Sequence, residues 1–215
     1  MRFTDKVVVV TGARGNLGAA VSSAFEKEGA IVVGLDMETN LLHQPTVDAA
    51  VEKIIRDKRS IHVLCNIAGG FRMGKPVHET TDGDWDFLFD INVRTVLHTA
   101  RAVVPHMIGA GGGKIVNMGA FAARKGAAQM GAYVASKSAL IRLTETMAAE
   151  LRDKSINVNC VLPTILDTPQ NRADMPNADP KRWVALEDAA QAILFLASDE
   201  ARAIHGAALP ITGLS

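Results

Sequence analysis

Short apolar runs alternate along the chain with stretches whose apolar residues recur every three or four positions. Residues 7–10, four consecutive valines, and residues 31–35 are continuous runs typical of strands buried on both faces of a parallel sheet. The stretch between them, residues 19–28, has the spacing of an amphipathic helix and ends at Gly29. The alternation predicts a single α/β domain over residues 1–215, with a doubly wound, mostly parallel sheet and helices on both faces.

The rest of the chain continues this alternation. A helix is expected at residues 84–107, with Asp84 as its cap and with Asn92 inside it, where an amide needs a hydrogen-bonding task. Pro210 predicts that the last strand lies at the edge of the sheet. The other expected strands are residues 61–65, 114–118, 157–162 and 207–211, and the other expected helices are residues 47–55, 132–152 and 186–198.

Two segments depart from the regular pattern. Only residues 37–46 separate the second strand from the helix at 47–55, so one crossover helix is expected to be missing or reduced. Residues 170–185 are polar and include Pro176 and Pro180, which predicts a substrate-side lid.

A glycine-rich turn joins the first strand to the first helix. Residues 11–18 read Thr-Gly-Ala-Arg-Gly-Asn-Leu-Gly, and Asp36 follows at the end of the second strand. Glycines let the backbone approach a pyrophosphate, the helix N-terminus supplies N–H donors, and the carboxylate can hold a ribose diol. The unit predicts a Rossmann-type dinucleotide-binding domain, whereas the structural alternative for Asp36 is a solvated acid at a strand end.

The only tyrosine of the chain, Tyr133, precedes Lys137 by four residues. On a helix the two side chains share one face. A phenol has a pKa near ~10, and a nearby ammonium favours the phenolate, so the pair suits acid/base work. Without further context such a pair is more often an ordinary feature of an amphipathic helix.

Composition narrows the function classes. Lys and Arg together number 23, and so do Asp and Glu, so nothing indicates a nucleic-acid or anionic-membrane partner, and a small-molecule substrate is expected. Cys65 and Cys160 lie in or at the end of apolar runs, which predicts buried free thiols and a cytoplasmic protein. The six histidines show no metal-ligand spacing, so no metal is expected.

Taken together, these pieces resemble the short-chain dehydrogenase/reductase family over nearly the whole chain. The resemblance implies that Tyr133 donates or accepts the proton, that Lys137 lowers its pKa and holds the nicotinamide ribose, and that Asn92 supports a proton-relay water. The matching stretches are residues 11–18, Asp36, residues 66–69, Asn92, Tyr133 with Lys137, and residues 163–168.

The resemblance also implies a cofactor. Asp36 would repel a 2′-phosphate, which favours NAD(H), although Arg14 could accommodate that phosphate of NADP(H). A homodimer or homotetramer formed through the two long helices is expected as in the family. The implied cofactor contacts are Gly12, Arg14, Gly15, Asn16, Leu17, Gly18, Asp36, Asn66, Ala68, Gly69, Tyr133, Lys137, Pro163, Thr164, Leu166 and Thr168.

Three positions depart from the family pattern. Asn16 stands at a usual glycine, where its tolerance of positive φ would preserve the turn, and Ile67 replaces an asparagine. Ala120 lies where the family has its catalytic serine, thirteen residues before Tyr133. Such a hydroxyl polarises a carbonyl, and losing a donor of this kind costs on the order of 10² or more in rate.

Three functions remain open from the sequence. The first is an oxidoreductase that transfers hydride between NAD(H) and a small carbonyl or hydroxyl substrate, with Tyr133 as acid/base. The second is a dihydropteridine reductase-like enzyme. Residues 162–172 and Ala120 resemble the corresponding residues of that subgroup, whose reaction needs no catalytic serine. The third is an NAD(H)-binding regulatory protein that has lost catalysis through Ala120.

Overall fold

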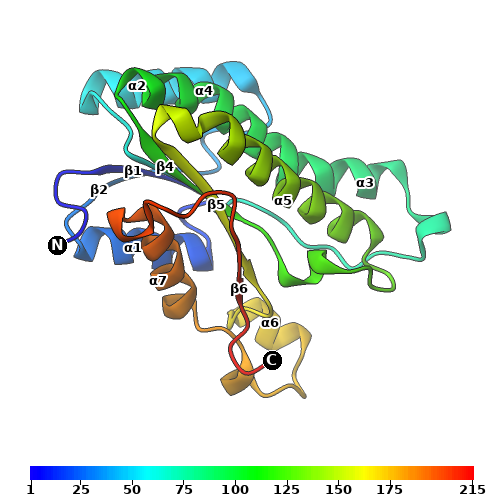
Figure 1. The fold of residues 1–215 in the computed structure, drawn as a ribbon. Coiled ribbons are helices and arrows are strands. Elements are labelled where there is room, and N and C mark those ends of the chain that lie inside the picture. Colours follow the sequence, from blue (N-terminus) through cyan, green and yellow to red (C-terminus); the bar gives the residue numbers. More distant parts are fainter.

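The computed structural model describes residues 1–215 and contains one six-stranded sheet in the order β2-β1-β3-β4-β5-β6, with every neighbouring pair parallel (Figure 1). The doubly wound sheet predicted from the apolar runs is therefore present. The strands are β1 Val7–Thr11, β2 Ile31–Leu35, β3 Val63–Asn66, β4 Gly113–Met118, β5 Ile156–Pro163 and β6 Ala208–Ile211.

Helices cover both faces of this sheet (Figure 1). One face packs against α1 and α7, and the other packs against α2, α4 and α5. The helices are α1 Asn16–Lys27, α2 Gln44–Lys58, α3 Asp82–Phe89, α4 Thr95–Gly109, α5 Gly131–Leu151, α6 Pro169–Asp174 and α7 Leu186–Ala197.

The four valines of β1 pack into two cores, one on each face of the sheet. Val8 and Val10 belong to the core beneath α1 and α7, whereas Val7 and Val9 belong to the core beneath α2, α4 and α5. Successive strand side chains point to opposite faces, so a strand covered on both sides has no polar positions. Each fully buried valine contributes roughly 1.5–3 kcal/mol of transfer free energy.

Strand order reverses beside β1, because β2 pairs on one side of it and β3 on the other. Crevices at such a switch point, outside the carboxyl ends of the strands, are where open α/β sheets bind ligands. The residues at the carboxyl ends of β1, β3, β4 and β5 are Thr11, Asn66, Met118 and Pro163.

The helix expected at 84–107 is present, within a helical run from Asp82 to Gly109 that contains a π-helical turn. The segment consists of α3, a π-helical turn at Asp90–Arg94 and α4, and Asn92 lies in the π turn. Asp84 is not the cap of α3, because the Thr81 hydroxyl accepts the hydrogen bond from the Asp84 backbone N–H. Thr81 can do so because it has extended backbone angles, as an N-cap requires.

Two further expectations concern the edge strands of the sheet, β2 and β6. Only α2 connects β2 to β3, and it is a full helix, longer than the expected 47–55. The helix expected at 47–55 is therefore present as part of α2, no second helix lies between β2 and β3, and β2 is an edge strand. Pro210 lies on the opposite edge strand, β6, as predicted.

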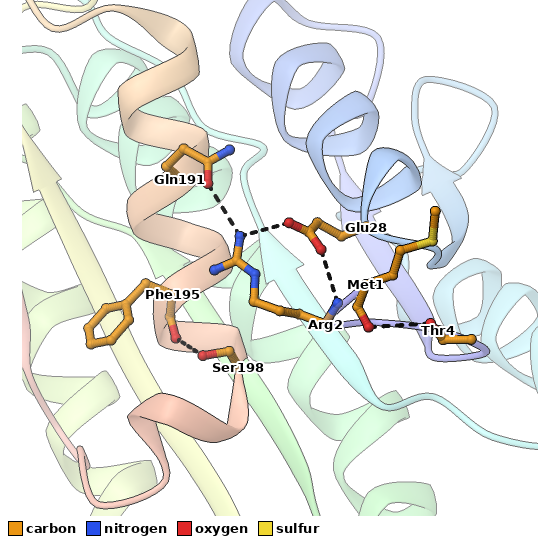
Figure 2. Close-up of polar contacts among 7 residues, drawn as sticks. All are labelled: Met1, Arg2, Thr4, Glu28, Gln191, Phe195 and Ser198. Carbon is orange, nitrogen blue, oxygen red and sulfur yellow. Dashed lines mark hydrogen bonds and ion pairs between the residues drawn. The ribbon is translucent and has the colours of Figure 1, made fainter.

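The N-terminus ties α1 to α7 (Figure 2). The Arg2 backbone N–H and guanidinium both donate to the Glu28 carboxylate, and the guanidinium also donates to Gln191 Oε1. Both cysteines are free and buried, as predicted. None of the helices has the length and apolar character that crossing a bilayer would require.

Candidate active site at the carboxyl edge of the sheet

The glycine-rich turn closes tightly between β1 and α1. Gly12 has φ +65° and its N–H donates to Leu35 O. A side chain at Gly18 would collide with the Gly12 carbonyl, so only glycine fits there. Asn16 is the first residue of α1 and does not have positive φ, so the expectation that it uses left-handed tolerance is wrong. The strained position belongs to Gly12.

Asp36 follows β2 and faces this turn. Its carboxylate accepts hydrogen bonds from the backbone N–H groups of Arg14, at 2.6 Å, and of Met37, at 2.9 Å. The Arg14 guanidinium makes two hydrogen bonds to the Glu38 carboxylate, at 3.0 and 3.1 Å. Arg14 is therefore paired with Glu38, a residue that the sequence reasoning did not single out.

A buried chain of polar side chains crosses the sheet behind the site. Asn66 Nδ2 donates to Asn117 Oδ1, and Asn117 Nδ2 donates to Thr144 Oγ1 on α5. Thr99 on α4 donates to Asn66 Oδ1. Every member has a partner, as buried polar groups need, so the chain fixes α4 and α5 against the central strands. Asn66 is thus a structural residue in this arrangement.

Hydrogen bonds from Thr11 and from Asn92 fix the segment that follows β3. Thr11 Oγ1 accepts the N–H groups of Ile67 and Ala68, both at 3.0 Å. Asn92 bonds both polar groups of Gly70, accepting its N–H at 2.9 Å and donating to its carbonyl at 3.0 Å. The bonding task expected of Asn92 is therefore present.

Asn92 also meets the tyrosine helix. Its Nδ2 donates to Ser136 Oγ at 3.1 Å, and Ser136 Oγ donates to the Tyr133 carbonyl at 2.8 Å. Ser136 is fully buried and lies three residues after Tyr133, a helical spacing that could have revealed it. The sequence reasoning missed this link.

Lys137 is buried and its Nζ donates to Met118 O at 2.7 Å, at the carboxyl end of β4. Gly69 separates it from Asn92, since a Cβ at Gly69 would lie 3.1 Å from Lys137 Nζ and 3.0 Å from Asn92 Oδ1. Asn92, Lys137 and the backbone of Tyr133 are therefore brought together at one edge of the sheet.

Burial is the main cause of the shifted pKa values of Tyr133 and Lys137. It raises the pKa of Tyr133 to about 12 and lowers the pKa of Lys137 to about 8. Burial disfavours whichever form is charged, which explains the opposite directions. In the chain alone desolvation sets the pKa of Tyr133 and the Lys137 ammonium donates to Met118 O, so the lowering of this pKa by Lys137 stays a prediction for the cofactor-bound enzyme.

Lys137 should leave a measurable pH signature in stability. Because its folded pKa is about 8 and the unfolded value is near 10.5, the unfolded chain binds more protons between these values. Stability should therefore rise with pH in this window. Relative to Lys137→Met, the wild type should gain about 1–2 kcal/mol of unfolding free energy between pH 7.5 and 9.5. Urea unfolding at several pH values measures this, and a constant difference would show that the ammonium is not desolvated.

The serines of the tyrosine helix do not take the place of the serine that the family has at Ala120. Ala120 is buried, and the two serines of the tyrosine helix are committed elsewhere. Ser136 donates to the Tyr133 carbonyl and Ser138 donates to the Ala123 carbonyl. The phenol of Tyr133 is therefore the acidic hydroxyl that this site offers.

The predicted contacts after β5 have partners within the chain. Thr164 Oγ1 donates to Thr212 O at 3.0 Å, and Thr168 Oγ1 accepts from Asn171 N as the cap of α6. Leu166 pairs with Val184 in an isolated bridge. The expected lid, residues 170–185, contains most of α6 and a 3₁₀ turn and leads to the buried Trp183.

Comparisons with known proteins agree with this arrangement. A family model described as Enoyl-(Acyl carrier protein) reductase matches residues 7–213. Cyclopentanol dehydrogenase of Comamonas testosteroni is 33% identical, with 99% of this chain and 97% of that protein covered.

Two solved structures of similar proteins contain the cofactor. NAD⁺-bound xylitol dehydrogenase matches with a TM-score of 0.92 and 28% identity, covering 99% of this chain and 100% of that chain. Carveol dehydrogenase from Mycobacterium avium in complex with NAD matches with a TM-score of 0.89 and 26% identity, covering 98% and 97%. The chain belongs to the short-chain dehydrogenase/reductase family and is an oxidoreductase of the Rossmann type.

Proposed function

We propose that the protein oxidises a small secondary alcohol, or reduces the corresponding ketone, with NAD(H) as the cofactor and Tyr133 as the acid/base. The observation that carries the proposal is the convergence of Lys137, Asn92 and the backbone of Tyr133 through Ser136 and Gly69. Relatives named as dehydrogenases of alcohols support the substrate class, and they favour neither the pterin reductase nor the regulatory alternative.

The residues of the turn fit a dinucleotide. The glycines at positions 12 and 18 let the turn close tightly where α1 begins, and the helix N-terminus favours an anionic pyrophosphate. Asp36 provides carboxylate oxygens at the end of β2, suited to a ribose diol. When bound, NAD⁺ supplies the acceptor for the hydride of the alcohol carbon.

The chain supplies proton transfer and orientation. In alcohol oxidation, the phenolate oxygen of Tyr133 takes the hydroxyl proton while the carbon–hydrogen bond breaks, and in ketone reduction the phenol returns that proton. We infer that Lys137 favours the phenolate by its positive charge once the cofactor ribose orders the ammonium. Asn92 keeps the segment at Gly70 in place through its two hydrogen bonds.

The free thiols and the family relationship support two further parts of the proposal. Buried, unpaired Cys65 and Cys160 suit a reducing compartment, which supports a cytoplasmic location. A homodimer or homotetramer is proposed from the family resemblance.

The test of the function itself is NADH production, followed at 340 nm, with cyclopentanol or xylitol as substrate. Absence of NADH formation with a panel of secondary alcohols would overturn the proposal.

Cofactor choice should depend on Glu38 as well as on Asp36. Because Glu38 pairs with Arg14, the guanidinium is withheld from a ribose 2′-phosphate. Glu38→Gln removes the charge and should raise the ratio of kcat/KM for NADP⁺ to that for NAD⁺ about threefold to fivefold, because an exposed ion pair contributes no more than about 1 kcal/mol. Glu79→Gln, at an exposed acid paired with His78, is the control and should leave the ratio unchanged. An unchanged ratio in Glu38→Gln would refute the role of this pair.

A further inference from the structure

Residues 70–77, here called the strap, run from the end of the Ala68–Gly70 segment across the start of α5. Gly70 is bonded at both polar groups by Asn92, and Gly74 N donates to Gln129 O at 2.8 Å. Val77 lies against Gly131, where an added Cβ would come within 2.9 Å of its side chain. The strap is therefore fastened to the first turn of the tyrosine helix.

Arg72 fastens the same strap to α3. Its guanidinium donates to Asp84 Oδ1 at 2.6 Å and lies over the Phe87 ring, 4.2 Å from the centroid. Asp84 also accepts the hydroxyl of Thr81, the cap of α3. A cation that is both paired and stacked loses much of its freedom, so the residue before it, Phe71, is held in place from both sides.

Phe71 meets the reacting residue directly. Its ring lies edge-on to the Tyr133 ring, with centroids 4.9 Å apart and an interplanar angle of 87°. A neighbouring cavity, lined by Arg72, Gly74 and Lys75 of the strap and by Tyr133 but not by Phe71, has a volume of about 10 Å³, at the lower limit for one water. Yet 56% of Phe71 remains exposed, which leaves an aromatic surface beside the phenol.

We propose that Phe71 is a specificity-determining residue, whose ring forms the apolar wall on which a cyclic, apolar secondary alcohol rests beside the phenol. This inference rests on the proposed function and names its substrate class. An apolar ring that covers Phe71 removes aromatic surface from water, and ring contacts add to that gain. A polyol would instead place its hydroxyl groups against the carbon atoms of the Phe71 ring, which offer them no hydrogen bonds.

The position of Ala120 strengthens this selectivity. With a methyl group where the family's serine stands, the buried surroundings contain one fewer partner for a substrate hydroxyl. Hydroxyls that are desolvated without partners cost binding free energy, and a polyol carries several. An alcohol with a single oxygen requires only the phenol of Tyr133.

The test compares cyclopentanol with xylitol in Phe71→Ala and in Met73→Ala. Met73 is a matched control, because it belongs to the same strap and is 57% exposed. The wild type should favour cyclopentanol. Phe71→Ala should lose roughly tenfold in kcat/KM for cyclopentanol, mainly through KM, and should change little with xylitol. Met73→Ala should resemble the wild type with both.

A binding experiment separates this inference from the proposed function. Cyclopentanone added to the NAD⁺-bound enzyme cannot react, and the single tyrosine labelled with ¹³C at Cζ gives one resonance that reports its binding. Phe71→Ala should weaken the Kd for cyclopentanone roughly tenfold. Binding without turnover of cyclopentanol would refute the alcohol dehydrogenase function and leave the role of Phe71 standing. Equal Kd values in the wild type and Phe71→Ala, or a wild type that prefers xylitol, would overturn the inference.

Discussion

Replacing Tyr133 with phenylalanine should lower kcat for alcohol oxidation by about 10³-fold, within the range that positioned acid/base groups contribute. The substitution removes one oxygen and keeps the ring that packs against Phe71. No other tyrosine exists in the chain, and the nearby serine hydroxyls donate to backbone carbonyls, so no neighbouring group can assume the role. The loss should appear in kcat and in kcat/KM alike, as for a contact made in the transition state.

Two measurements keep this result interpretable. The Kd for NADH, measured by fluorescence, should be within a few-fold of the wild-type value, because the phenol oxygen is one of many implied cofactor contacts. Thermal unfolding should show an intact fold. Turnover of Tyr133→Phe equal to that of the wild type would remove the phenol from the mechanism.

Gly69→Ala should lower kcat by roughly tenfold, less than the 10²-fold that a misplacement of about 1 Å can cost, because its neighbours must shift by only a few tenths of an ångström. The new methyl group would lie 3.0 Å from Asn92 Oδ1 and 3.1 Å from Lys137 Nζ. Both contacts are tighter than carbon normally makes, and neither neighbour can yield freely. Asn92 is bonded to Gly70 and Ser136, and Lys137 is bonded to Met118 O.

Gly126→Ala is the matched control for this substitution. A Cβ at Gly126 would meet nothing within 4 Å, and the residue lies in the loop before α5. Its kcat should equal that of the wild type. The two variants together separate the steric effect at Gly69 from a general effect of losing a glycine. Wild-type kcat in Gly69→Ala would show that the geometry between Asn92 and Lys137 is not demanding.

Much of the fold could be predicted because its signals are local. Short, largely apolar runs marked the strands, and the order of turn, helix, strand and acid marked the nucleotide-binding unit. The π turn at Asn92 could not be predicted in this way. It depends on Asn92 reaching Gly70 and Ser136, partners distant in sequence.

In the candidate site, too, the features with local sequence signals could be predicted and those that depend on distant contacts could not. Tyr133 and Lys137 are visible as a helical pair, but their pKa values in the chain alone depend on burial by elements far along the chain, which the local sequence does not reveal. Glu38 and Phe71 carried no motif. Their roles follow only from what they contact, Arg14 in one case and Tyr133 in the other.

The most direct test of the acid/base role is the pKa of the Tyr133 phenol in the NAD⁺-bound enzyme, measured by ¹³C NMR of the single Cζ-labelled tyrosine. In the chain alone the phenol should remain protonated at pH 10, because burial raises its pKa to about 12. With NAD⁺ bound, the resonance should titrate at the same pH at which kcat for cyclopentanol oxidation rises. A phenol that stays protonated throughout the pH range in which kcat rises would contradict the assignment of Tyr133 as the base.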